Sequence, residues 1–235
     1  MSAERTCFGL IRRLPFVAIT LSLLTLSFLC APARASALSV TDIDVRLGLM
    51  WIGNAYTVDS SGNAVQFSAV SPLTGTVGID LGIPLSSSLT FRPGLDLFGI
   101  QYYETPGGKV VPTSIEAPNA LLMIDALVSL PVVYTWNLGN SWSLSAGASP
   151  SLLFRIPFIP YGDPDVGAIT AYMYKSLRFF YPEIQGSLLY DFQKRFQFGI
   201  TLRGLAPIFH LWDGEGVAFW DQLMVSGILF LRFSL

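Results

Sequence analysis

The segment 220–235 alternates strictly between two kinds of residue. One set is apolar or glycine: Leu223, Val225, Gly227, Leu229, Leu231, Phe233 and Leu235. The intervening set is mixed: Gln222, Met224, Ser226, Ile228, Phe230, Arg232 and Ser234. A period of two is typical of a β-strand. An apolar face opposite a mixed face is the pattern of a transmembrane barrel strand, because lipid contacts the outside while the lumen is partly polar.

The same period recurs in seven earlier segments, each bounded by turn or loop residues. They cover residues 42–52, 73–83, 89–103, 121–135, 142–156, 176–192 and 196–205. Three connections between segments are short, and four are longer, roughly 53–70, 104–120, 157–175 and 206–220. Short turns at one end and longer loops at the other are typical of membrane barrels. We therefore predict an all-β fold, an eight-stranded antiparallel up-and-down transmembrane β-barrel.

One hairpin and the last strand carry a family resemblance. The hairpin is SLPVVYTWNLGNSWSLSAGASPSL, residues 129–152. It resembles a hairpin of the small eight-stranded bacterial outer-membrane β-barrel proteins, a class with OmpA-transmembrane, OmpX and OmpW types. The C-terminal strand resembles their closing strand, which the barrel-insertion machinery recognises and which ends on an aromatic residue. Here the chain ends on Leu235, and Phe233 is the nearest aromatic residue.

The resemblance implies a monomer in the cell outer membrane, surrounded by outer-membrane lipid. An even number of strands places both termini on one side, which we expect to be the periplasm, with the long loops extracellular. The N-terminus fits export, because three arginines precede an apolar run at 14–29 and small residues follow at 31–37 with A-x-A cleavage sites. We predict a cleaved signal peptide over residues 1–37 and a barrel domain over 38–235.

Charge and cysteine content exclude several classes of protein. Cys7 and Cys30 both lie in the predicted signal peptide, so the mature domain would contain no disulfide and no thiolate metal site. Removing residues 1–37 leaves ten basic against fifteen acidic residues, a balance that argues against nucleic-acid binding. Only 13% of residues are charged, which is low for a domain surrounded by water.

The predicted inner rows carry charges of both signs. The residues are Asp44, Arg46, Asp80, Arg92, Asp96, Asp125, Glu183, Arg203 and Arg232. The lumen of an eight-stranded barrel has room only for side chains or a small ligand, so these charges must pair. We predict a charge network that fills the lumen, and a protein that is not a general porin.

Towards the long loops the inner rows become apolar. The residues are Met50, Phe98, Ile100, Met123, Leu153, Leu205 and Met224. Such a cup above a polar floor would suit a small hydrophobic ligand, since ligand pockets are mostly apolar with few polar anchors. The other interpretation is that these side chains fill space beneath folded loops.

Few residues carry a signal for catalysis or metal binding. His210 lies near Asp213 and Glu215 in HLWDGEG, but no nucleophile is marked, and we expect an exposed polar loop. Asp163 and Asp165 could hold a hard cation, although carboxylates around a proline are more often an ordinary turn. We predict no enzymatic activity, no cofactor and no metal. A barrel-embedded lipid-modifying enzyme is a remote alternative.

Aromatic residues gather near the predicted strand ends, as expected for two belts at the membrane interfaces. One belt would contain Trp51, Tyr102, Tyr103, Phe179, Tyr181, Phe209, Trp212 and Trp220. The other would contain Tyr134, Trp136, Trp142, Tyr190, Phe192, Phe196 and Phe198. The alternation of faces could shift by one residue at a bulge near any of four prolines, Pro93, Pro131, Pro150 and Pro182.

Two functions remain open at this stage. The first is an outer-membrane barrel whose surface-exposed loops contact host or envelope macromolecules or support the envelope. The second is binding or lateral passage of small hydrophobic molecules, which the resemblance to the OmpW type implies. The discriminating feature is whether the apolar inner residues surround a ligand or are covered by the loops.

Overall fold

A computed structural model describes residues 39–58, 64–66, 71–105, 108–113, 119–193, 195–214 and 218–235. The predicted signal peptide, residues 1–37, lies outside the described residues. The chain divides into the units Met1–Ser39 and Val40–Leu235, and the second contains every described strand. Within the described ranges, no helix has the length and apolarity that crossing a lipid bilayer requires.

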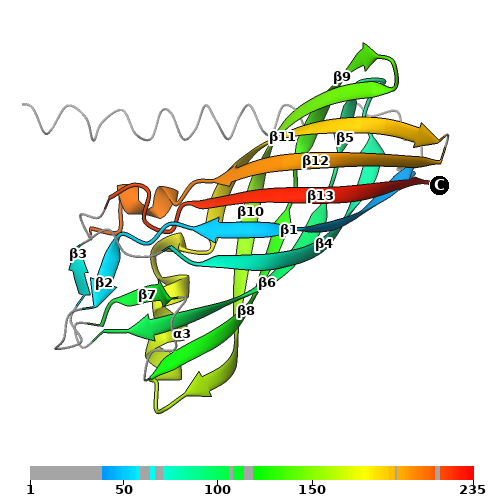
Figure 1. Cartoon of the computed structure of the whole chain (residues 1–235). Coiled ribbons are helices and arrows are strands. Elements are labelled where there is room, and N and C mark those ends of the chain that lie inside the picture. Colours follow the sequence, from blue (N-terminus) through cyan, green and yellow to red (C-terminus); the bar gives the residue numbers. More distant parts are fainter. Residues whose placement is uncertain are drawn as a thin grey trace, which may run out of the picture. The chain divides into compact units, whose positions relative to one another are not determined.

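Eight antiparallel strands form a closed ring, as the alternation predicted (Figure 1). Their bounds are β1 Asp42–Ile52, β4 Leu73–Pro84, β6 Gly94–Glu104, β8 Ala120–Ser129, β10 Trp142–Tyr161, β11 Phe180–Gln193, β12 Phe196–Leu205 and β13 Met224–Ser234. Two short pieces continue neighbouring strands, β5 Leu89–Phe91 before β6 and β9 Val132–Gly139 after β8. Every residue of β1 lies opposite a residue of β13, so the last strand seals the ring without a free edge.

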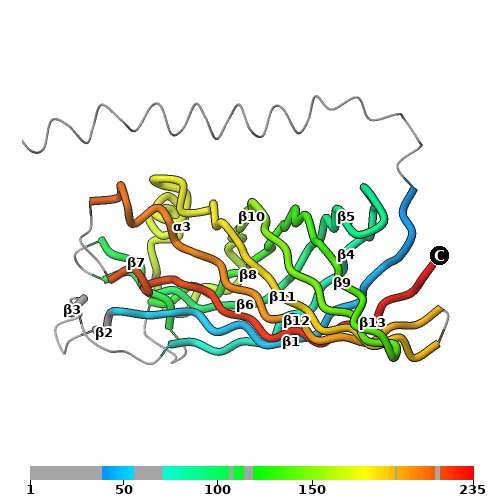
Figure 2. The backbone as a smooth tube through the Cα atoms, turned by 90° about the horizontal axis from the view of Figure 1, so that it is seen from above, coloured from blue at the N-terminus to red at the C-terminus, as the bar shows by residue number. Residues whose placement is uncertain are grey.

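The two ends of the barrel differ. At the turn end, short connections at 85–88 and 140–141 join strands, β11 ends two residues before β12 begins, and the first residue of β1 lies opposite Ser234 of β13 (Figure 2). The loop end carries the remaining elements. These are β2 Tyr56–Val58, β3 Ala64–Gln66, β7 Val110–Thr113, α3 Val166–Tyr174, η1 Lys175–Leu177 and η2 Ile208–Leu211.

The third long connection is displaced from its predicted position at 157–175. It spans residues 162–179, because β10 continues to Tyr161 and β11 begins only at Phe180. The upper part of β10 stays paired with β8 as far as Ala120, through a register shift between Pro157 and Ile159. A bulge of this kind lets a strand continue beyond an interrupted ladder.

None of the four prolines shifts the alternation of faces. Around Pro93, the buried positions remain even-numbered from Arg92 to Asp96. The alternation also continues through Pro131, although the two proline segments divide β5 from β6 and β8 from β9. Pro150 and Pro182 lie directly opposite each other in the β10–β11 pair. The inward rows are therefore the ones that the sequence pattern indicates.

The outward rows form an exposed apolar band around the ring. Leu47 in the middle of β1 is 63% exposed, and apolar residues of the other main strands are exposed in the same way, except in β8, where the outward residues are half-buried. A water-soluble protein rarely exposes a continuous apolar surface of this kind, whereas lipid covers it in a membrane barrel.

The aromatic residues follow the predicted belts at one end only. At the turn end, Tyr134 contacts Trp136 and Trp142 contacts Tyr190, each pair with ring centroids 4.8 Å apart, and all four are exposed. At the loop end the prediction is wrong for three residues: Tyr102, Tyr181 and Phe209 are buried inside the barrel. Tyr102 and Tyr181 occupy inward positions of their strands, and Phe209 lies on η2 beneath the loops.

Candidate functional site

A chain of ion pairs crosses the turn-end half of the lumen. We call it the lumen network; it contains Asp42, Asp44, Arg46, Asp80, Arg92, Asp96, Glu183, Arg203 and Arg232. Eight of these residues belong to the predicted set, and Asp42 at the start of β1 joins them. The strands place these side chains inward, and antiparallel pairing aligns Asp44 with both Asp80 and Arg232.

Arg92 and Arg46 link the carboxylates of β1 and β4. The Arg92 guanidinium lies 2.7 Å from Asp44 and 2.6 Å from Asp80. Arg46 lies 3.1 Å from Asp80 and 3.0 Å from Asp96. Because guanidinium groups donate several hydrogen bonds in a plane, one arginine can pair with two or three carboxylates at once.

Arg203 continues the network towards β11. Its Nε donates to Glu183 Oε1 at 2.7 Å, and it also pairs with Asp96. Two hydroxyl groups add further hydrogen bonds. Ser151 donates to Glu183 at 2.6 Å, and Ser129 accepts from Arg203 at 2.7 Å. Buried charges are tolerated when each has a partner and further hydrogen bonds. Every charge of the network has an oppositely charged partner, whereas Arg46 Nε donates no hydrogen bond and Asp96 Oδ1 accepts none among the described residues.

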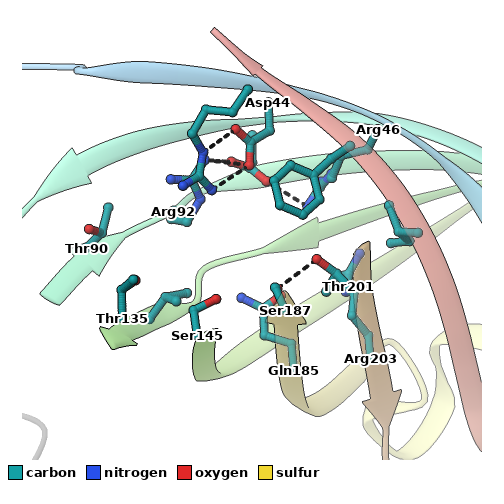
Figure 3. Close-up of a pocket in the computed structure, with 15 residues that line it drawn as sticks. Asp44, Arg46, Thr90, Arg92, Thr135, Ser145, Gln185, Ser187, Thr201 and Arg203 are labelled. Carbon is teal, nitrogen blue, oxygen red and sulfur yellow. Dashed lines mark hydrogen bonds and ion pairs between the residues drawn. The ribbon is translucent and has the colours of Figure 1, made fainter. Parts of the chain in front are cut away.

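A small polar cavity lies beside the lumen network. Figure 3 shows Asp44, Arg46 and Arg92 on one wall, facing a wall of hydroxyl and amide side chains that includes Ser145 and Gln185. Its volume is about 40 Å³, room for a few water molecules. The turn-end half of the barrel is therefore obstructed, with only a small polar cavity left open.

Asp125 does not belong to the lumen network, although the sequence analysis grouped it there. It lies one layer higher, opposite Phe98 of β6 and Arg155 of β10. Its Oδ1 is 3.6 Å from Arg155 Nε, and neither of its carboxylate oxygens accepts a hydrogen bond among the described residues. The buried Asp125–Arg155 pair is thus separate from the lumen network.

Arg155 is a residue that the sequence analysis missed. Its guanidinium donates to the hydroxyls of Tyr102 at 3.2 Å and Tyr181 at 3.1 Å, and to the backbone carbonyl of Arg178 at 3.1 Å. The signal was present, because Arg155 lies on the same inward row of β10 as Leu153. The row was followed only as far as Leu153, next to the expected strand end at Ile156.

All seven residues of the predicted apolar cup lie in one buried cluster, each at most 5% exposed. The structure thus brings together Met50, Phe98, Ile100, Met123, Leu153, Leu205 and Met224. The space between them is occupied by Ile169 and Met173 of α3 and by Phe209 of η2. Loop side chains therefore fill the cup in this structure.

The loops over this cluster are held by a buried polar group. We call it the loop cap cluster: Arg178, His210, Asp213 and Asp221. Arg178 donates to Asp213 at 3.0 Å, and the two nitrogens of His210 face Asp213 and the backbone carbonyl of Asp221. The expectation of an exposed polar loop around His210 is wrong, because Phe209 anchors this loop in the apolar cluster. Glu215 lies outside the described residues.

Of the two candidate cation ligands of YGDPDVG, Asp165 uses its side chain to cap a helix, and Asp163 contacts the preceding long connection through its backbone amide. The Asp165 side chain caps the first turn of α3 by accepting the amide of Ala168 at 2.8 Å. The backbone amide of Asp163 donates to Asn119 at 3.0 Å. Among the described residues, no group of three His, Cys, Asp or Glu side chains is arranged to hold a metal ion.

Comparisons with known proteins come from structure alone. No protein-family model and no curated protein sequence matches the chain. Neisserial surface protein A superposes with a TM-score of 0.51 at 9% identity, over 84% of this chain and 98% of its own. The outer membrane protein OprG from Pseudomonas aeruginosa superposes with a TM-score of 0.42 at 9% identity, over 83% of this chain and 93% of its own. From its closed ring and the first of these likenesses, the chain has the fold of the small eight-stranded β-barrel proteins of bacterial outer membranes.

Proposed function

We propose that this chain is an integral outer-membrane barrel that acts through its folded loop end, in contact with host or envelope macromolecules or in support of the envelope. Both termini lie in the periplasm in this proposal, and the loop end faces outward. The main observation in support of this proposal is that both halves of the lumen are closed. The lumen network obstructs one half of the barrel, and loop side chains fill the other.

The loop end has a surface suited to such contacts. Leu177, Leu211, Trp212 and Phe219 are all large, apolar and exposed. Trp212 is held in place, because its Nε1 donates to the backbone carbonyl of Ser176 at 2.8 Å. Ordered aromatic side chains contribute much of the binding free energy at protein interfaces.

The alternative is binding or passage of small hydrophobic molecules. One observation favours it, since the buried ion pair Asp125–Arg155 lies beside Phe98 of the apolar cluster and could serve as a polar anchor. A ligand would have to displace Ile169, Met173 and Phe209, so α3 and η2 would have to move. We place this function second for that reason. The lipid-modifying enzyme gains no support, because both ring nitrogens of His210 already have partners.

Orientation is tested by single cysteines, because the predicted mature domain has none. Leu211→Cys at the loop end and Leu85→Cys at the turn end are matched, since both side chains are exposed. A membrane-impermeant maleimide applied to intact cells should label Leu211→Cys alone. Labelling of Leu85→Cys alone would invert the proposed orientation.

Membrane insertion is tested by a charge on the outer face. Leu47→Arg should destabilise the barrel in lipid vesicles by about 2–4 kcal/mol, the cost of an arginine near the bilayer midplane. Leu85→Arg, in a turn outside the band, should change the free energy of unfolding by less than about 0.5 kcal/mol. Equal effects would argue against lipid contact at Leu47.

The interior is tested by two further measurements. Planar-bilayer recordings should show no large stable conductance, and a porin-sized current would refute the closed lumen. A fatty-acid-like probe should not bind the wild-type protein. Binding that is lost in Phe98→Asp and Met224→Asp would favour the hydrophobic-ligand function instead.

A further inference from the structure

The loop-end part of β10 differs in exposure from the rest of the strand. Up to Arg155 the strand alternates between more exposed outward residues and less exposed inward ones. Residues 156–160, with the sequence IPFIP, are exposed at every position, and none has a polar side chain. Ile156, Phe158 and Ile159 are 55%, 59% and 39% exposed. We call residues 156–160 the β10 extension. A continuous exposed apolar surface of this kind marks contact with a membrane or a protein.

The β10 extension is the edge of an ordered sheet. On one side it stays paired with β8, where Ile156 lies opposite Ile124 and Pro160 lies opposite Leu121 (Figure 1). On the other side, the pairing of β10 with β11 ends at Leu152. The extension is therefore held in place by β8, while its second edge has no partner strand among the described residues.

The backbone amides where this edge begins are not available to a further strand. The Leu153 amide donates to the carbonyl oxygen of Phe179 at 2.7 Å. The Arg155 amide donates to the hydroxyl of Tyr174 at 3.0 Å, and that hydroxyl donates to the Arg155 carbonyl oxygen at 3.1 Å. Alternate residues of a strand face the same edge, so Pro157 takes the next position, and proline has no N–H. An added strand would find no free amide at these three positions, whereas lipid requires that amides be satisfied or absent.

The extension also continues the outward apolar row of β10. Every second residue from Trp142 to Phe158 is apolar, a distance of about 53 Å along the strand at about 3.3 Å per residue. The outward row of β1, from Ile43 to Trp51, covers about 26 Å. About 9–11 residues of a tilted strand are enough to cross the hydrocarbon of a bilayer. The apolar row is therefore about twice as long on β10 as on β1, and its loop-end part exceeds what a bilayer crossing needs.

We propose that the β10 extension binds acyl chains of membrane lipid beyond the level that the rest of the barrel reaches. A bilayer can thicken locally around an apolar surface that is longer than its hydrocarbon. Acyl chains suit the all-apolar side chains and the occupied edge, whereas a polar or strand-forming partner suits neither feature. This inference rests on membrane insertion of the barrel. It is independent of the proposed orientation and of the proposed contacts of the loops.

Fluorescence quenching by lipid tests the position of the extension. Phe158→Cys, Leu47→Cys and Leu211→Cys, all at exposed side chains, would each carry a bimane label in vesicles of phosphatidylcholine brominated on its acyl chains. The predicted mature domain has no other cysteine. Relative to vesicles without bromine, the label at Phe158 should lose as much emission as the label at Leu47 in the middle of the band. The label at Leu211 on η2 should lose little.

Three results would overturn the inference. Quenching at Leu47 but not at Phe158 would place the extension outside the lipid while leaving membrane insertion intact. Quenching at neither position would remove membrane insertion and the inference together. A disulfide-linked dimer of Phe158→Cys in place of quenching would assign the extension to a second copy of the chain.

A second measurement counts the lipid that the extension holds. The double variant Ile156→Thr/Phe158→Thr keeps residues that favour strands and should lower the number of motionally restricted spin-labelled lipids per barrel. Leu177→Thr/Leu211→Thr is the matched control, because it also removes two exposed apolar side chains from the loop end, and it should leave that number unchanged. Equal numbers in wild type and both variants would contradict lipid binding by the extension. Heat-modifiable gel mobility verifies that each variant retains the barrel.

Discussion

The two halves of the lumen are filled by different parts of the chain. In the turn-end half, almost every group of the lumen network projects from a strand, and partners such as Asp44 and Arg232 lie opposite each other in the β-ladder. In the loop-end half, strand residues supply only the walls. The space between them is filled by Ile169, Met173 and Phe209, which belong to loop elements.

This difference separates two kinds of stability. The lumen network is tied to strand register, so it can change only if the barrel itself changes. The loop elements contribute through packing and a few polar contacts, which can open without disrupting the ring of strands. We expect variants in the first region to lower the stability of the whole barrel and variants in the second to act locally.

The largest effect is expected when the lumen network loses a cation. Arg203→Met should lower the free energy of unfolding by about 3–5 kcal/mol, because Glu183 and Asp96 are left buried without their shared partner. Urea titration in lipid vesicles, followed by gel mobility, measures it. Arg195→Met in an exposed turn is the control and should have almost no effect.

A double variant separates the cost of an unpaired buried charge from the cost of lost packing. Adding Glu183→Gln to Arg203→Met removes one uncompensated charge, so part of the lost stability should return. If the double variant is less stable than Arg203→Met alone, the cost arises from lost packing rather than from buried charge.

A smaller and local effect is expected in the loop-end half. Phe209→Ala should lower the free energy of local opening by about 3 kcal/mol, because it leaves a cavity in the apolar cluster. Faster amide exchange in residues 166–174 and 206–212 should reveal it, while the urea midpoint of the barrel stays within error. Phe219→Ala is the control, since Phe219 is exposed. An equal loss of global stability in Phe209→Ala would remove the distinction between the halves.

The smallest effect tests how tightly the charged half is packed. A Cβ on Gly78 would overlap the Asp96 carboxylate and lie 2.6 Å from the carbonyl oxygen of Leu95. Gly78→Ala should therefore cost about 1–3 kcal/mol in urea titration. Gly75→Ala on the same strand has nothing within 4 Å of the added Cβ and should be nearly neutral. Equal costs for the two variants would mean that the network tolerates displacement.

Part of the candidate site was predictable from alternation. The inward residues of the lumen network and the apolar cup follow from a period of two, which is a local property of each strand. The grouping of Asp125 with the lumen network was wrong because sequence order does not give the position of a residue along the barrel axis. The same alternation predicts an inward position for Arg155 and a buried Tyr102, if each inward row is followed to the end of its strand.

The sequence by itself determined the number of strands, the face on which each strand residue lies and the closure of the ring, because these follow from the local pattern and the lengths of the connections. Only the tertiary structure decided which arginine meets which carboxylate, since that depends on register across the lumen. It also decided that the cup is filled, because α3 and η2 lie in irregular connections whose residues carry no periodic signal.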